Sequence, residues 1–380
     1  MKVYLLLALI AAAVTYLMTP VVRHVALSTR AITPVRARDV HIRPVPRLGG
    51  VAMFLGLAVG TLVASQIPYL ERVFTASSQA WGILGAALLL TALGVADDLW
   101  DLDWVTKLAG QVLAAGFMAW NGVVLFSLPV FGLTIGSSTF SLAITVLVVI
   151  VMINAVNFVD GLDGLAAGVL AIAGLAFFAY TYLLTRDVSP GDYASLATAV
   201  VAILVGVCVG FLPHNFHPAS IFMGDCGSMV LGQTFAAAAI LVTGNVDPGE
   251  VASRQLVPVF LPILLPVAVL LLPLTDMLLA VTRRMRAGKS PFAPDRMHLH
   301  HRLLDLGRSH VRAVLTMYLW AAVIAFSVAA LVVLPPRTVA IGAAVATAAA
   351  VALTFALLPG LRRGRAAAAQ TPVEKTVENA

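Results

Sequence analysis

The sequence predicts an all-α polytopic membrane protein with about eleven transmembrane helices, long loops on one side and a small hairpin on the other. Of its 380 residues, 60% are hydrophobic and only 11% are charged, and the mean hydropathy is +0.97. A soluble domain cannot bury that much apolar side-chain surface, so the soluble classes are excluded. The two cysteines, Cys208 in an apolar run and Cys226 in a polar loop, are expected to be free thiols.

Apolar runs of membrane-spanning length predict the helices one by one. The expected spans are residues 3–22, 48–66, 81–96, 105–120, 141–156, 164–184, 194–212, 228–244, 257–282, 314–333 and 338–358. Between the fourth and fifth spans, residues 125–136 alternate apolar residues with turn formers, which favours a short hairpin outside the hydrocarbon. We expect residues 1–361 to form one transmembrane domain and residues 362–380 to form a disordered tail.

The basic residues indicate how the chain is oriented. If the N-terminus lies outside, the segments on the inner side and their flanks hold 19 of the 24 lysines and arginines. This asymmetry matches the positive-inside rule, so we expect an outside N-terminus and an inside C-terminus. Topology therefore explains most of the net charge of +6. Because no arginine-rich helix with interleaved aromatic residues is present, a nucleic-acid partner is not expected.

Acidic residues gather at the predicted inner ends of the helices. Asp97 and Asp98 end the third span, Asp160 and Asp163 follow the fifth, and Asp225 precedes the eighth. A carboxylate near hydrocarbon is costly unless it has a partner or a function. Converging carboxylates need cations, and oxygen ligands at loop–helix junctions suit Mg²⁺. The plainer alternatives are a helix end for the first pair, and an N-cap with a turn for the second.

The segment around the last of these aspartates has the features of a phosphate-binding turn. It reads Phe-Met-Gly-Asp-Cys-Gly-Ser from Phe222 to Ser228 and leads into a helix. Glycines let backbone N–H groups approach a phosphate, and a helix N-terminus favours negative charge. The alternatives are a plain N-cap by Ser228 and an interfacial anchor for Phe222. On the fifth span, Asn154 and Asn157 add two amides that can face a ligand.

Two basic loops are candidates for phosphate contacts. Arg43 and Arg47 lie in a proline- and glycine-containing approach to the second span, where positive-inside counting also predicts arginines. The second loop contains a His-Leu-His-His run preceded by an arginine, with residues Arg296, His298, His300 and His301. For this loop phosphate contact ranks first and a purely topological role second. Zinc ranks third, because no cysteine pair and no obvious fourth ligand is nearby.

Taken together, these motifs resemble the polyprenyl-phosphate N-acetylhexosamine-1-phosphate transferases, which form glycosyltransferase family 4. The resemblance rests on motifs in the family's order, namely Asp97-Asp98, Lys107-Leu-Ala-Gly-Gln, and residues 154–164, 222–227 and 294–304. The MraY branch typically carries three consecutive histidines followed by Phe-Glu. The His-Leu-His-His-Arg run departs from that pattern, and this difference and the eleventh span favour the WecA/TagO branch.

The resemblance implies an activity, a cofactor and a set of roles. The activity is transfer of N-acetylglucosamine 1-phosphate from UDP-N-acetylglucosamine to polyprenyl (undecaprenyl or decaprenyl) phosphate, releasing UMP. The sequence does not decide between direct displacement, which we favour, and a covalent aspartyl intermediate. It would require Mg²⁺, with Mn²⁺ as a substitute, at the cytoplasmic face of a bacterial inner membrane. The implied catalytic and metal-binding residues are Asp97, Asp98 and Asp225. The implied nucleotide-binding residues are Asn154, Asn157, Asp160, Asp163 and Phe222. Lys107, His298, His300 and His301 resemble diphosphate and sugar contacts, to which charge alone adds Arg43, Arg47 and Arg296.

Three alternatives stay open at this point. The same reaction with another UDP-sugar, such as UDP-N-acetylmuramoyl-pentapeptide, differs only in the donor. An ion-coupled transporter would place its acids near the bilayer midplane, whereas here they are expected at one face. The oligomeric state is undetermined, and a homodimer is one expectation.

Overall fold

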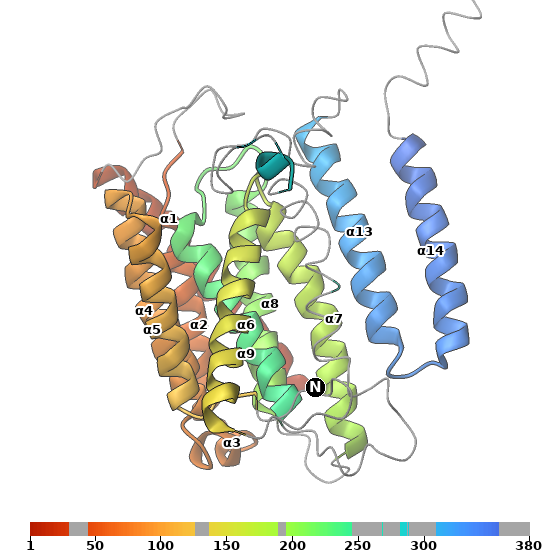
Figure 1. The fold of residues 1–380 in the computed structure, drawn as a ribbon, viewed down its shortest axis with the longest axis horizontal. Helices are drawn as coiled ribbons and strands as arrows, with labels where there is room; N and C mark the ends of the chain where they lie inside the picture. The colour runs from red at the N-terminus through yellow and green to blue at the C-terminus, as the bar shows by residue number, and fades with distance from the viewer. Residues whose placement is uncertain are drawn as a thin grey trace, which may run out of the picture.

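The computed structural model describes residues 1–29, 45–125, 137–188, 195–244, 268, 282–286, 288 and 309–356. Within these ranges the chain forms a bundle of long helices (Figure 1). The helices are α1 (Lys2–Ser28), α2 (Gly49–Ser65), α3 (Glu71–Thr75), α4 (Gln79–Trp100), α5 (Trp104–Trp120), α6 (Ser138–Val159), α7 (Leu165–Val188), α8 (Leu196–Asn215), α9 (Gly224–Gly244), α13 (His310–Ala330) and α14 (Pro336–Ala356).

The predicted fold class, an all-α polytopic membrane protein, is confirmed. Eight of the described helices are long and apolar enough to cross a membrane, and α2 is a shorter apolar helix. Ten of the predicted spans coincide with described helices, whereas the span at 257–282 falls almost entirely outside the described residues. The hairpin after Leu125 and the tail at 362–380 also lie outside them. The five-residue helix α3 was not predicted, because it is too short to produce an apolar run.

Two helices form the centre of the bundle. Within the apolar 18-residue stretch of each helix, 83% of the residues of α8 and all of those of α9 are buried. The first packs against α1, α2 and α7, and the second against α4 and α6. By contrast, α14 packs on α13 at the margin of the bundle (Figure 1). Only 11% of its apolar 18-residue stretch is buried. A helix that is apolar all round and mostly exposed is suited to contact with lipid.

Small residues bring α2, α4 and α9 into close contact at one end of the bundle. A Cβ atom on Gly50 would lie 2.1 Å from the backbone nitrogen of Gly227, and one on Gly94 would lie 2.3 Å from the Cα of Cys226. Backbones that approach this closely leave no room for a side chain, which explains glycine at both positions. The contact places the end of α4 beside the start of α9.

The turn between α4 and α5 completes this end of the bundle. Asp101 ends α4 in the left-handed conformation, with φ 54°. Asp103 then caps α5 by accepting hydrogen bonds from the backbone N–H groups of Val105 and Thr106. The tight connection sets the last turn of α4 opposite the first turns of α5.

Candidate functional site

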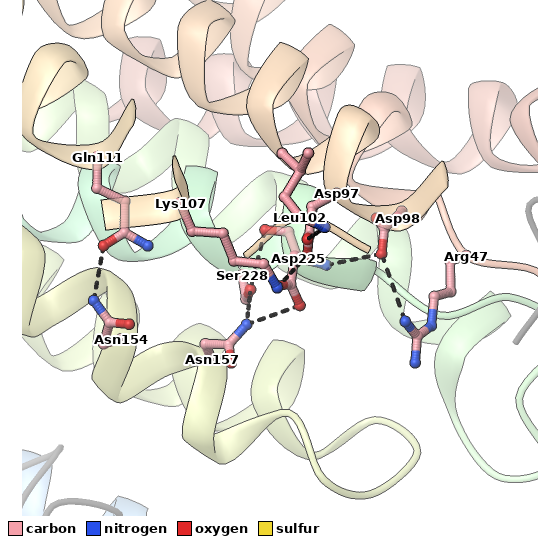
Figure 2. A network of polar contacts seen from close by, with 10 residues as sticks. All are labelled: Arg47, Asp97, Asp98, Leu102, Lys107, Gln111, Asn154, Asn157, Asp225 and Ser228. Carbon is pink, nitrogen blue, oxygen red and sulfur yellow. Dashed lines mark hydrogen bonds and ion pairs between the residues drawn. The ribbon is translucent and has the colours of Figure 1, made fainter. Parts of the chain in front are cut away.

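Three helix ends meet around one lysine. Asp97 lies in the last turn of α4, Lys107 near the start of α5, and Asp225 in the first turn of α9. The Nζ atom of Lys107 lies 2.7 Å from Oδ2 of Asp97 and 3.2 Å from Oδ2 of Asp225 (Figure 2). One cation is therefore shared between two carboxylates.

Asp98 is the most enclosed carboxylate of the group, since its side chain has no exposed surface. Its Oδ1 accepts a hydrogen bond from the backbone nitrogen of Asp225 at 3.4 Å and lies 3.9 Å from Nη1 of Arg47 (Figure 2). Its Oδ2 is buried and has no hydrogen-bond partner among the described residues. A buried carboxylate oxygen without a donor is costly, so this atom fits a cation ligand.

Asp97 differs from its neighbour in this respect. Its Oδ1 accepts a hydrogen bond from the backbone nitrogen of Leu102 at 2.9 Å, and its Oδ2 pairs with Lys107. Both oxygens are therefore engaged by the protein. Asp225 also has both oxygens engaged, by Asn157 and Lys107. By this measure Asp98 fits a divalent cation better than Asp97 or Asp225, whose partners would first have to move.

Gly224 makes the approach of Asp98 possible. It has φ +68°, and a Cβ atom there would lie 2.2 Å from Oδ2 of Asp98. Only glycine combines this backbone conformation with this lack of a side chain. The glycine before Asp225 therefore brings the start of α9 directly against the buried carboxylate of α4.

An amide from α6 holds the other side of Asp225. Asn157 Nδ2 donates to Oδ1 of Asp225 at 3.1 Å and to Oγ of Ser228 at 3.0 Å. One turn earlier, Asn154 donates to Oε1 of Gln111 on α5 at 2.9 Å (Figure 2). A stripe of neutral polar groups on α5 and α6 thus continues from the charged cluster into the bundle.

Residues 216–223, the loop before α9, are bound to the chain that precedes α2. The backbone nitrogen of Phe222 donates to the carbonyl of Pro46 at 2.9 Å, and Gly49 donates to the carbonyl of Phe222 at 2.9 Å. Gly50 donates to the carbonyl of Met223 at 2.8 Å. These bonds hold the backbone of Phe222, a half-buried residue, beside the start of α2 and next to the start of α9.

Asp160 and Asp163 lie in residues 160–164, the loop after α6. Asp160 follows the last residue of α6 and is half-buried. Burial, followed by the negative charge of Asp225, raises the pKa of Asp160 to about 7. Asp163 is buried, and its Oδ2 accepts from the backbone nitrogen of Ala219 at 3.1 Å and lies 2.8 Å from Nδ1 of His217.

The structure thus brings together most of the site residues predicted from the sequence. One network joins Arg47, Asp97, Asp98, Lys107, Asn157 and Asp225, and Asn154 lies one turn farther along α6. Asp160, Asp163 and Phe222 lie in the two adjoining loops. The remaining candidates, Arg43, Arg296, His298, His300 and His301, fall outside the described residues.

Several polar residues were missed as site residues. Gln111, Asn215, His217 and His310 were not selected, and Ser228 was considered only as an N-cap. That N-cap assignment is wrong, because α9 begins at Gly224 and Ser228 lies inside the helix. Gln111 is four residues after Lys107, on the same helix face, and that spacing was the one available signal.

Comparison with known proteins identifies the family. The model of glycosyl transferase family 4 matches residues 80–243, which carry Asp97, Asp98, Lys107 and Asp225. The chain is 44% identical over 368 residues to a Mycolicibacterium smegmatis protein named decaprenyl-phosphate N-acetylglucosaminephosphotransferase, covering 94% of this chain and 89% of the relative. The chain belongs to glycosyl transferase family 4.

More distant relatives come from two branches of the family. A Yersinia pestis protein named undecaprenyl-phosphate alpha-N-acetylglucosaminyl 1-phosphate transferase is 31% identical, over 80% of this chain and 78% of its own. A Desulforudis audaxviator protein named phospho-N-acetylmuramoyl-pentapeptide-transferase is 30% identical, over 83% of this chain and 96% of its own. The family resemblance predicted from the motifs is confirmed, and the higher identity lies on the N-acetylglucosamine side.

Proposed function

We propose that this glycosyl transferase family 4 enzyme transfers N-acetylglucosamine 1-phosphate from UDP-N-acetylglucosamine to a polyprenyl phosphate and releases UMP. One observation carries the proposal. The aspartates of α4 and α9 are held around Lys107 at one end of a membrane bundle, in a chain 44% identical along most of its length to a decaprenyl-phosphate N-acetylglucosaminephosphotransferase. The site offers oxygen ligands and fixed cations together, which is what transfer between two phosphates requires.

The reaction needs two anions to approach each other. An oxygen of the lipid phosphate attacks the β-phosphorus of the nucleotide sugar, and the bond from that phosphorus to the bridging oxygen of UMP breaks. Lys107 and Arg47 lie on either side of the aspartates and supply fixed positive charge toward the phosphates. We assign Asp98 a place beside the lipid phosphate as a metal ligand, because it is enclosed and one of its oxygens has no donor among the described residues.

The donor set also fits a divalent cation. Mg²⁺ prefers oxygen ligands and usually takes one or two carboxylates together with waters and substrate phosphates. Asp225 and Asp98 would hold Mg²⁺, or Mn²⁺ in its place, and the bound ion would supply positive charge to offset that of the diphosphate. Asn157 donates to Oδ1 of Asp225, whereas Lys107 pairs with Oδ2, and Ser228 accepts a second hydrogen bond from the same amide. These contacts orient the Asp225 carboxylate, which supports its role as a ligand.

The nucleoside is proposed to lie along the two adjoining loops. Asp160, Asp163 and Phe222 belong to these loops, and Asn157 joins them to the aspartate cluster. The orientation that the charge asymmetry predicts puts this end of the bundle in the cytoplasm of a bacterium, where a nucleotide sugar is available. A homodimer stays a prediction that the mass of the purified protein–detergent particle would test.

The decisive experiment compares donors. The detergent-purified protein is given decaprenyl phosphate, Mg²⁺ and either UDP-N-acetylglucosamine, UDP-N-acetylgalactosamine or UDP-N-acetylmuramoyl-pentapeptide, and UMP and the lipid product are measured. We expect turnover with UDP-N-acetylglucosamine that requires both lipid and metal. Turnover of the pentapeptide donor alone would overturn the assigned sugar, and release of UMP without lipid would contradict direct displacement.

Two variants make the test specific to the site. Asp225→Asn keeps the shape of the side chain but removes its charge, and we expect a loss of at least ~100-fold in kcat. Asp103→Asn, on an exposed helix cap near the site, is the matched control and is expected to stay within about threefold of the wild type. Equal activity of Asp225→Asn and the wild type would contradict the proposed metal ligand.

A further inference from the structure

A second polar cluster lies beside the proposed nucleoside site. His310, the first residue of α13, stacks on His217, with ring centroids 4.3 Å apart and ring planes 15° apart. His217 Nδ1 is in turn 2.8 Å from Oδ2 of Asp163, whose side chain is only 1% exposed. The ligand-type atoms of these three residues all lie within 4.8 Å of one another. We name them the Asp163–His217–His310 cluster.

The cluster joins three segments that are far apart in the sequence. Asp163 belongs to the loop at 160–164, His217 to the loop at 216–223, and His310 to the start of α13. The two loops are also joined by Asn215, which accepts from the backbone nitrogen of Gly164 at 3.1 Å and donates to the carbonyl of Ile221 at 3.0 Å. The cluster thus adds α13 to a pair of loops that are already bonded together.

A second contact from α13 reaches the loop at 160–164. The hydroxyl of Tyr318 donates to the carbonyl of Gly164. A Cβ atom on Gly168 would lie 2.0 Å from the Tyr318 ring, so the helix face there must be bare. Because α13 touches one loop through Tyr318 and the other through the His310 stack, the position of this helix and the shape of the two loops depend on each other.

The ring geometry argues against a transition-metal site. A histidine binds a metal through a nitrogen lone pair that lies in the plane of the ring. The rings of His217 and His310 are nearly parallel and stacked, so their lone pairs cannot converge on one ion unless a ring rotates. His217 Nδ1 is already within hydrogen-bond distance of Asp163. The arrangement is that of a stacked, hydrogen-bonded bridge between segments.

We propose that His310 is a positioning residue for the nucleotide sugar, acting through its stack on His217 to hold the loops that carry Asp160 and Phe222. This inference rests on the proposed function, in which those two loops bind the nucleoside. We expect loss of the stack to leave Asp97, Asp225 and Lys107 in place, because the contacts described for them run to one another and to Asn157. The effect therefore falls on binding of the donor more than on the chemical step.

The test measures binding and turnover separately in the full-length, detergent-purified protein. The variants are His310→Ala, His217→Ala, the double variant and His310→Phe, which keeps an aromatic ring at the stack. For the alanine variants we expect the Kd and KM for UDP-N-acetylglucosamine to rise ~10-fold, with kcat within about threefold of the wild type. The double variant should be no worse than His217→Ala alone, since that change already removes the stack. His310→Phe should recover most of the affinity.

Controls separate the possible outcomes. His24→Ala, on the exposed surface of α1, should behave as the wild type. An unchanged Kd in both alanine variants would overturn the inference, even if their unfolding temperature falls. A stoichiometric transition metal that is present in the wild type and lost in the variants would overturn it in favour of a metal site. If the wild type binds the donor without turning it over, the proposed function fails, and the Kd comparison alone decides the role of His310.

Discussion

At the scale of single residues, the site is a set of carboxylates whose oxygens are unequally satisfied. Asp97 has both oxygens engaged, by Leu102 and Lys107, whereas Oδ2 of Asp98 has no hydrogen-bond partner among the described residues. Adjacent aspartates that look equivalent in the sequence thus differ in whether an oxygen is left to bind a cation. The helix end explains the difference, because the backbone N–H groups that follow α4 reach only the first of the pair.

Substitution of Gly224 tests the close approach of Asp98. In Gly224→Ala the new methyl group would collide with Oδ2 of Asp98 at a positive φ, so the carboxylate must be displaced. We expect kcat to fall ~100-fold, as is typical when a reacting group moves by about 1 Å. Gly122→Ala is the matched control, since Gly122 also has a positive φ but the nearest described atom to its new methyl group, on Gln79, would be 3.6 Å away. Equal activity losses in the two variants would show that backbone strain, and not the displacement of Asp98, is responsible.

The raised pKa of Asp160 predicts a dependence of stability on pH. Burial raises this pKa from 3.8 to about 7, so between these values the folded protein keeps a proton that the unfolded chain has lost. The contribution of Asp160 to stability therefore falls as the pH rises from about 4 to about 7 and is constant above that. Asp160→Asn removes this pH-dependent loss of stability. The unfolding temperature of the variant minus that of the wild type should therefore increase as the pH rises from 5 to 8 in metal-free detergent.

Asp103 provides a control for this experiment, because its pKa is shifted in the opposite direction. Hydrogen bonds from Thr106 lower the pKa of Asp103, so its charged form stabilises the folded state once the pH is above the ordinary value of 3.8. Asp103→Asn should therefore show no relative gain as the pH rises from 5 to 8. Parallel unfolding curves for Asp160→Asn and the wild type would contradict the prediction for Asp160.

The charged residues of the site could be predicted from the sequence, and its neutral residues could not. Asp97, Asp98 and Asp225 stand out because a carboxylate next to an apolar run is costly and therefore informative. Gln111, Asn215 and Ser228 carry no such signal, since neutral polar residues are common at helix ends. Their roles depend on which helices become neighbours, and that is a property of the fold.

At the scale of helices, the apolar run underestimates the length of several helices. The first span was predicted to end at residue 22 and extends to Ser28, and α9 begins at Gly224, four residues before the predicted start. Hydropathy detects only the part of a helix within hydrocarbon, whereas backbone hydrogen bonding continues into the polar region. The site lies in these polar extensions, which is why Asp225 is in a helical turn and not in a loop.

Packing of α4 against α9 can be tested at Gly94. A methyl group there would meet the backbone of Cys226 at 2.3 Å, so Gly94→Ala must push the two helices apart. We expect a loss of about 1–3 kcal/mol, which is usual for overpacking in a tight core. Gly116→Ala, in α5, is the control because no atom lies within 4 Å of its Cβ position. Its unfolding temperature should stay equal or rise, and an equal fall in both variants would contradict the proposed contact.

At the scale of the whole molecule, exposed tryptophans mark the two membrane interfaces. Trp100 and Trp104 are 73% and 62% exposed at the site end of α4 and α5, and Trp120 is 91% exposed at the other end. Tryptophan is enriched at the level of lipid headgroups. Asp97 and Asp98 lie within one turn of Trp100, so we expect these carboxylates at the depth of the lipid phosphate. Aspartates at one interface, and not at the midplane, favour transfer to a lipid over ion transport.

Labelling of single cysteines tests which face of the membrane carries the site. Ser28, at the site end of α1, and Ala76, near the opposite end of α4, are both exposed, and each can be replaced by cysteine. The native cysteines are buried, so the wild type gives a low background with a membrane-impermeant maleimide. In intact spheroplasts we expect labelling of Ala76→Cys, and labelling of Ser28→Cys only after permeabilisation. The reverse pattern would put the site outside, where UDP-sugars are absent, and would contradict both the charge-based orientation and the proposed donor.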